Sequence, residues 1–216
     1  MRRSEYGKNL TFFLEPEPPF LGCNQVLMGE RESTFVLPPS LEREIEEKWN
    51  KKSGGKRPLR EGAWRYEGYT FDSDKNLHLW VSPTKYVWHN ILRETKGMPD
   101  SFYPSPITVN SIQETTDGFI PIAVRGGISD QRGLCFFGSG FFDNEKNLPP
   151  KNPFSVAYSE CHEEGAYDLL CPESAFDIQD ARFLGLSRGS NTDLTTYIYI
   201  PLRVPHTKLR LNPENK

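Results

Sequence analysis

The chain of 216 residues contains little cysteine, and its four cysteines, at positions 23, 135, 161 and 171, form no C-x-x-C pair. This spacing argues against a zinc site or a thioredoxin-type redox pair and predicts reduced thiols. No apolar run approaches the ~18 residues that a membrane-spanning helix needs. The first residues also lack the apolar core of a signal peptide. We therefore expect a cytoplasmic protein that does not bind membranes.

A concentrated basic stripe is also missing, since 26 basic and 29 acidic residues give a net charge of -3. This balance argues against a nucleic-acid partner. Small anionic ligands remain possible, because a bound metal ion can supply positive charge. Internal repeats and low-complexity tracts are absent too. What is present, 36% hydrophobic and 12% aromatic residues, is enough to bury a core, and 18 prolines and 17 glycines predict many turns and short elements.

Residues 1–100 are expected to form an N-terminal α+β extension. A helix over 41–52 should be capped by Ser40 and should bury Ile45 and Trp49. The aromatic stretches that follow predict a hairpin joined by a polar turn. Strands are expected at 10–14, 25–28, 34–37, 63–71 and 77–82, with a helix over 84–94.

Residues 101–216 are expected to form a C-terminal α/β domain. Thr116, Asp117 and Gly118 are a strong turn signal and predict a hairpin between 108–113 and 119–124. The remaining strands are expected at 134–137, 181–187 and 195–204.

A Glu-rich helix is the feature around which this domain is organised. Asn152 is a favoured N-cap ahead of Pro, and Gly165 is a natural stop. Glu160, Glu163 and Glu164 lie on one arc of the helix, where such neighbours sit ~5–6 Å apart and repel each other unless something compensates. Converging carboxylates suit Mg²⁺, which prefers oxygen ligands. The alternative is a solvated acidic helix surface.

This arrangement resembles the Nudix hydrolase family. The segment 159–167 is similar to the second half of the family's box, which reads Arg-Glu-aliphatic-x-Glu-Glu-x-Gly-aliphatic. Residues 137–143 look like the strand and Gly turn that precede the box helix, and 119–125 look like the family strand that ends in Arg. The resemblance implies an α/β/α sandwich with a mixed sheet over residues 106–204.

The chain also departs from the family pattern. Ser159 stands at the position of the box Arg, Ala166 stands at that of the box Gly, and the loop before the helix is longer. The first Glu of the box has no clear counterpart. In the family this Glu pairs with the Arg, so the loss of both leaves no unpaired charge. Because the three metal-binding carboxylates are retained, the pattern favours a divergent but working site.

The order of elements looks like the branch of the family that cleaves UDP-sugars. The resemblance implies hydrolysis of the pyrophosphate bond of a nucleoside diphosphate derivative to a nucleoside monophosphate and a sugar phosphate. Mg²⁺, with Mn²⁺ as a substitute, would be held by the three glutamates and the backbone carbonyl of Ser139. Which acid serves as general base stays open.

Four further residues are candidates for substrate binding, each with a structural alternative. Arg125 and Arg188 could clamp phosphates or form surface salt bridges. Phe141 and Phe142 could stack on a base or pack in the core.

Two other functions remain open. One is the same chemistry on ADP-ribose, NAD-like or dinucleoside substrates. The other is a Nudix-fold module that binds nucleotides and has lost catalysis.

Overall fold

The computed structural model describes residues 11–14, 19–33, 35–54, 61–95, 98–124, 134–136, 138–142, 152–165, 176–188 and 193–209. The backbone alone is described at 11–13, 61, 100, 123–124, 134–136 and 162–165. The helices are α1 (Pro39–Ser53), α2 (Tyr86–Leu92) and α3 (Pro153–Gly165), with short 3-10 turns at Asp100–Phe102 and His206–Lys208. The strands are β1 (Thr11–Leu14), β2 (Val26–Glu30), β3 (Glu61–Phe71), β4 (Leu77–Lys85), β5 (Ile107–Glu114), β6 (Ile122–Val124), β7 (Leu134–Phe136), β8 (Ser139–Phe141), β9 (Arg182–Arg188) and β10 (Leu194–Pro201).

The central element is a five-stranded sheet in the order β1-β9-β10-β5-β8. The middle strand β10 and its neighbour β5 run parallel, in register from Ile107 and Leu194 to Glu114 and Pro201. The other neighbours in this sheet are antiparallel. The expectation of a mixed α/β protein with a mixed sheet is therefore confirmed.

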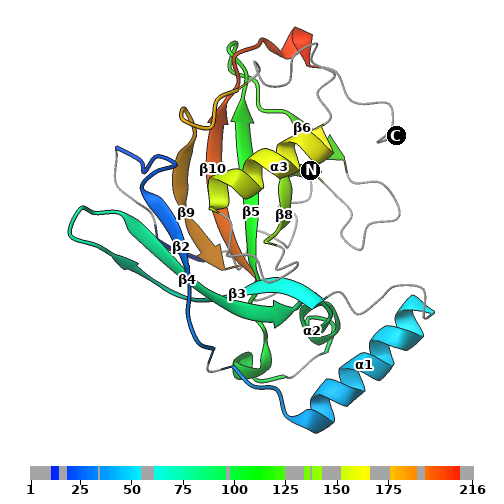
Figure 1. The fold of residues 1–216 in the computed structure, drawn as a ribbon. Coiled ribbons are helices and arrows are strands. Elements are labelled where there is room, and N and C mark those ends of the chain that lie inside the picture. The colour runs from blue at the N-terminus through cyan, green and yellow to red at the C-terminus, as the bar shows by residue number, and fades with distance from the viewer. Residues whose placement is uncertain are drawn as a thin grey trace.

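A second, three-stranded sheet has the order β2-β4-β3 and is also mixed, since β2 runs parallel to β4. Its inward side chains, such as Trp64 and Leu79, enter one hydrophobic core together with Ile107 of β5, Phe154 of α3 and Ile198 of β10. Figure 1 shows this smaller sheet below α3, which lies across β10, β5 and β8. The predicted extension and the C-terminal domain thus share one core.

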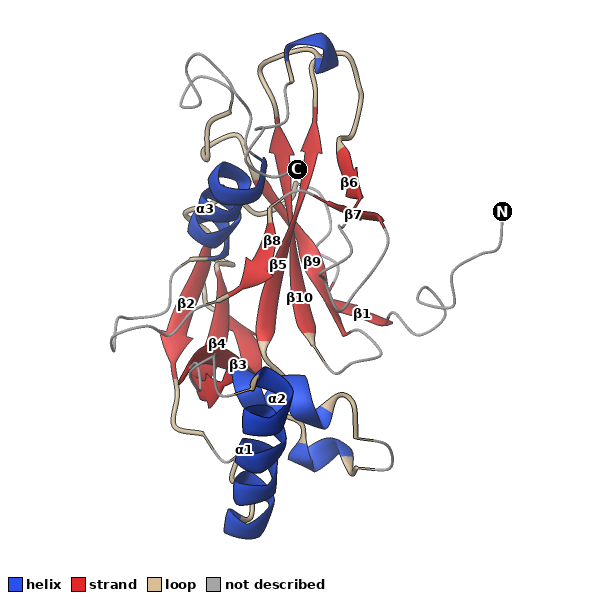
Figure 2. Ribbon diagram, turned by 90° about the vertical axis from the view of Figure 1, so that its right-hand side faces the viewer, coloured by secondary structure: helices blue, strands red, loops and turns tan. Residues whose placement is uncertain are grey.

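The five-stranded sheet has one buried face and one open face. Successive residues of β5 and of β10 alternate between buried and half-buried along the whole strand. Figure 2 shows α3 on one side of the sheet, with α1 and α2 at its lower end. In the described part of the chain, no helix covers the open face. The second helical layer of the expected α/β/α sandwich is therefore not found among the described residues.

The helices of the extension follow local signals, with one correction. Ile45 and Trp49 are buried as predicted and pack with Val87 and Ile91 of α2 in a second core. The predicted cap is wrong, because the helix begins one residue before Ser40. Pro38 precedes the helix in an extended conformation. Pro39 opens the helix, and its ring fixes φ near the helical value.

Two strand predictions are wrong. Residues 35–37 lie in irregular backbone rather than in a strand. The predicted hairpin between 108–113 and 119–124 is absent, since β5 pairs with β10 and β8 and β6 pairs with β7. The turn itself forms, with Gly118 donating its N–H to the carbonyl of Thr115 at 2.9 Å. The end of β5 is instead occupied by the segment after β10, whose Leu202 N–H bonds to the Glu114 carbonyl at 2.7 Å.

Among the helices that the structure describes, none has both the length and the apolar character needed to cross a bilayer.

Candidate functional site

Helix α3 begins and ends where its sequence predicts. The Asn152 side-chain oxygen accepts the N–H of Phe154 at 2.8 Å, and Pro153 is the first helical residue. The Asn152 amide also donates to the carbonyl of Cys23 at 3.0 Å and to that of Val26. The cap residue therefore fixes the start of α3 to the entry of β2.

The Gly turn (residues 138–140), which leads into β8, lies directly against α3. Gly138 has φ +72°, and a Cβ at this position would stand 2.5 Å from both Cys161 Sγ and Ser111 Oγ. A Cβ at Gly140 would stand 2.2 Å from the carboxylate carbon of Glu160. Only glycine permits these approaches without a shift in the structure. The carboxylate of Glu160 therefore rests on the backbone of the turn.

Under this contact lies a buried polar cluster of Ser111, Gln113 and Cys161. The amide nitrogen of Gln113 is 3.0 Å from Cys161 Sγ and 3.1 Å from Ser111 Oγ, and the hydroxyl is 3.2 Å from the thiol. The N–H of Ser111 also bonds to the Gly138 carbonyl at 3.1 Å. Cys161 is a buried thiol, in line with the expectation of reduced cysteines. The cluster joins α3, β5 and the turn.

Sequence reasoning missed the two polar partners of Cys161. Ser111 and Gln113 share their side of β5 with the buried Ile107 and Val109. The alternation of side chains along a strand could have indicated that both polar residues face the core.

The structure brings together two of the predicted metal ligands. Ser139 opens β8 opposite Asn110, one residue from the glycine that Glu160 covers. The side chains of Glu163 and Glu164 lie outside the described residues. Among the side chains that the structure describes, no group of three His, Cys, Asp or Glu is placed to hold a metal.

Ser159, at the box position of Arg, donates its hydroxyl to the carbonyl of Ser155 at 3.1 Å. The short Ser159 side chain therefore bonds within α3, whereas the longer side chain of an arginine would extend away from it.

The predicted substrate residues occupy different environments. Arg125 lies outside the described residues, while Arg188 is exposed at the end of β9. Phe142 is buried in the core, in line with the packing alternative. Phe141 is half-buried and contacts the extension, since its ring centre is 4.9 Å from that of Tyr86 in an edge-on arrangement.

The predicted hairpin aromatics also differ from one another. Trp64 is in the core, and Trp80 is covered by Arg31, whose guanidinium lies 5.0 Å from the ring centre. Tyr66 is partly buried, and burial raises the pKa of its phenol, a shift that the charge of Arg188 opposes.

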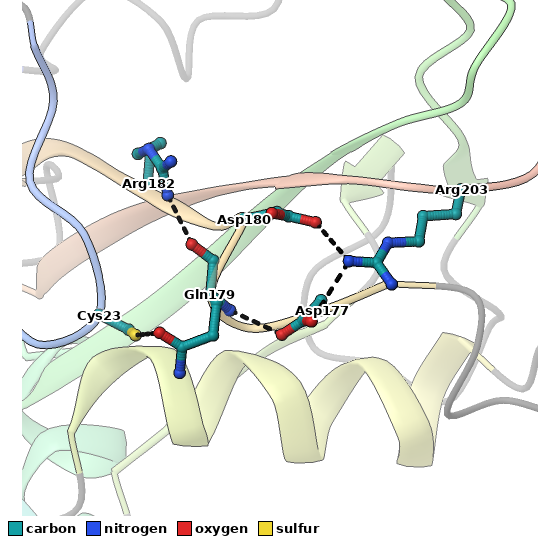
Figure 3. A network of polar contacts seen from close by, with 6 residues as sticks. All are labelled: Cys23, Asp177, Gln179, Asp180, Arg182 and Arg203. Atoms are coloured by element: carbon teal, nitrogen blue, oxygen red, sulfur yellow. Dashed lines mark hydrogen bonds and ion pairs between the residues drawn. The ribbon is translucent and has the colours of Figure 1, made fainter.

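A separate polar network fastens the loop before β9 beside α3 (Figure 3). Arg203 donates to Asp180 at 2.7 Å and to Asp177 at 3.2 Å. The hydrogen bond with Asp180 is the main cause that raises the pKa of Arg203. Gln179 accepts the Cys23 thiol at 3.3 Å, which connects the same loop to the entry of β2. Each acid here is already paired with a cation, so the network is structural.

Comparison with known proteins assigns no family, because no protein-family model and no curated protein matches the chain. We therefore infer the function from the residues of α3 and the Gly turn.

Proposed function

We propose that the protein is a Mg²⁺-dependent hydrolase of the Nudix type that cleaves the pyrophosphate bond of a nucleoside diphosphate derivative. A UDP-sugar is the leading substrate, and the products would be a nucleoside monophosphate and a sugar phosphate. The observation that carries the proposal is the contact between the Glu160 carboxylate and Gly140. It joins the Gly turn and the acidic helix, which are separated in the sequence and which the family resemblance expects to form one site.

The chemistry of the donor set fits a hard divalent cation. Glu160, Glu163, Glu164 and the Ser139 carbonyl offer oxygen atoms alone, as Mg²⁺ and Mn²⁺ prefer. No sulfur or imidazole ligand is among them. When bound, such an ion would neutralise phosphate charge and acidify a water molecule.

The residues of the chain would accept a proton and would hold the catalytic groups in place. One of the three glutamates would accept the proton of the water that attacks phosphorus, while the P–O bond of the anhydride breaks. Because the three acids interact, their protons belong to the group rather than to single residues. The cluster of Ser111, Gln113 and Cys161 would hold the helix that carries them at a fixed height above the sheet.

The test is hydrolysis of a panel of UDP-sugars, ADP-ribose, NAD and dinucleoside polyphosphates with Mg²⁺ or Mn²⁺. Glu163→Gln and Glu164→Gln are each expected to lower kcat by about 10²-fold or more. The matched control is Glu47→Gln, an exposed Glu of α1, which should retain full activity. Near-normal rates in both site variants, with the fold intact by circular dichroism, would reject the assignment.

Gly140→Ala tests the contact between Gly140 and the Glu160 carboxylate directly. The added methyl group would displace the Glu160 carboxylate, which is the mobile end of a side chain. We expect a loss of activity of about tenfold with little change in thermal stability, because only a side-chain end must shift. Unchanged activity would show that the contact does not matter for turnover.

A nucleotide-binding module without catalysis is the second candidate. It is favoured by Ser159, which bonds to its own helix where the family has an Arg. Calorimetry distinguishes the two: binding of UDP-sugar or ADP-ribose without hydrolysis at millimolar Mg²⁺ and Mn²⁺ would favour the module.

A further inference from the structure

A buried histidine and an aspartate meet where the extension contacts the C-terminal part of the chain. His89 of α2 has no exposed surface, and its Nε2 lies 2.9 Å from Oδ1 of Asp193. Asp193 immediately precedes β10, and its side chain is 20% exposed. The pair therefore connects α2 to the start of a central strand.

The burial of this pair is unfavourable for the stability of the fold. Although the two atoms are close, neither ring nitrogen of His89 nor Asp193 Oδ1 completes an aligned hydrogen bond with the described residues. Buried polar groups without such bonds destabilise the folded state. Replacing a buried ion pair with apolar side chains is often neutral or stabilising. Stability alone therefore does not explain this pair. Buried polar groups that lack aligned hydrogen bonds concentrate at functional positions.

Aromatic contacts lead from the pair to the Gly turn. The ring of Phe141 lies 5.8 Å from that of His89 and 4.9 Å from that of Tyr86, both on α2. Phe141 follows Gly140 in β8, and successive residues of a strand face opposite sides. One side of β8 therefore meets α2, and the other meets the Glu160 carboxylate.

We propose that His89 and Asp193 form a positioning pair for the candidate site. The pair holds α2 against the start of β10, so that Tyr86 and Phe141 keep β8 and its glycine in place beneath Glu160. The effect of the pair on the candidate site passes through β8. A polar contact suits this role because it joins α2 and the start of β10 at one defined point, between His89 Nε2 and Asp193 Oδ1. The inference rests on the proposed function, which it deepens by making the extension part of the active enzyme.

The experiment compares His89→Phe, His89→Gln and Asp193→Asn in the full chain. Phenylalanine keeps the ring packing and removes the polar contact, whereas glutamine keeps a donor. The control is Ser82→Ala, because Ser82 is equally buried in the extension but bonds to Glu67, away from the pair. For each variant, kcat and KM on the best UDP-sugar, the melting temperature and Mn²⁺ binding by electron paramagnetic resonance are measured.

We expect His89→Phe and Asp193→Asn to lower kcat by about tenfold with KM within about twofold, since misplacement of catalytic groups acts on turnover. His89→Gln should recover part of the rate. The melting temperature of His89→Phe should equal or exceed that of the wild type. Mn²⁺ should still bind to all variants, because the ligands are unchanged.

Three results would overturn the inference. An active wild type with unchanged kcat in His89→Phe and Asp193→Asn removes the role of the pair and leaves the proposed function intact. A wild type that hydrolyses nothing overturns the proposed function and this role with it. A fall in kcat that follows the melting temperature, or that Ser82→Ala reproduces, shows a purely structural effect. If His89→Phe does not fold, Asp193→Asn decides, because Asp193 is partly solvated.

Discussion

The two faces of the five-stranded sheet are built from alternate residues of the same strands. Because one face is buried and the other is half-buried, the two should differ in their tolerance of substitutions. Toward α3, Val109 and Ile198 are fully buried, and the buried Gln113 on the same side of β5 donates its amide to Cys161 of α3. On the other face, Tyr197 and Tyr199 are half-buried. Tyr199 donates to Glu114 at 2.7 Å, which raises the pKa of the Tyr199 phenol. The frame of the candidate site is attached to the buried face, so changes there should affect both fold and activity.

The largest expected effect is that of Gly138→Ala on the buried face. Its methyl group would clash with Cys161 and Ser111 at a positive φ, and we expect a loss of roughly 2–4 kcal/mol of unfolding free energy from strain and overpacking. Gly118→Ala is the matched control, because Gly118 has φ +81° and nothing within 4 Å of an added Cβ. It should cost only about 1 kcal/mol. Urea unfolding measures both, and equal losses would show that the contact with α3 is loose.

A smaller effect is expected from two adjacent threonines of β10 that face opposite sides. Thr196 is fully buried and donates to the Thr108 carbonyl at 2.9 Å, whereas Thr195 is half-buried beside the Thr108 hydroxyl at 3.0 Å. Thr196→Val should cost about 1 kcal/mol, and Thr195→Val should stay within about 0.5 kcal/mol. If thermal unfolding ranks the two the other way, the two faces do not differ as described.

The smallest effect is a loss of stability in acid that begins at turns rather than on the buried face, whose polar cluster contains no carboxylate. Hydrogen bonds from His78 and from the Asn76 amide lower the pKa of Asp72 to about 2. Thr115, followed by His206, lowers the pKa of Asp117. A depressed folded-state pKa stabilises the fold above the unfolded value near 4, and this contribution is lost as the pH falls toward about 2. Unfolding free energies measured from pH 6 to pH 2.5 should fall, and less so in Asp72→Asn and Asp117→Asn.

Local chemistry made the helices predictable. Asn152 and Pro153 determine the start of α3 through capping and backbone preferences that need no distant partner. Ile45 and Trp49 mark the buried side of α1 by their spacing alone.

Strand pairing was less predictable, because its partners are far apart in the sequence. The turn signal at 116–118 is real, but β5 pairs with β10, a strand about ninety residues later in the sequence, which no local pattern indicates. In the described part of the chain, the prediction of helices on both faces of the sheet failed for the same reason. Which face is covered, and where the extension packs, depends on tertiary contacts.

The candidate site was predictable in part. The closeness of the Gly turn and Glu160 was expected from the family resemblance. The pairing of His89 with Asp193 was not, since each residue by itself is an ordinary polar residue in a helix or a turn. Only the folded chain brings them to 2.9 Å.

The position of β1 has a consequence for how the chain acquires its structure during synthesis. Thr11 pairs with Arg188, and Ile107 pairs with Leu194, so the edge strand β1 and the inner strand β5 both depend on partners that are synthesised much later. Pairings over such distances close slowly, because the loop entropy is lost before the contacts form. The early strands must therefore wait, with apolar surface exposed, until β9 and β10 have emerged. A nascent chain that stalls before residue 180 should therefore be a substrate for chaperones.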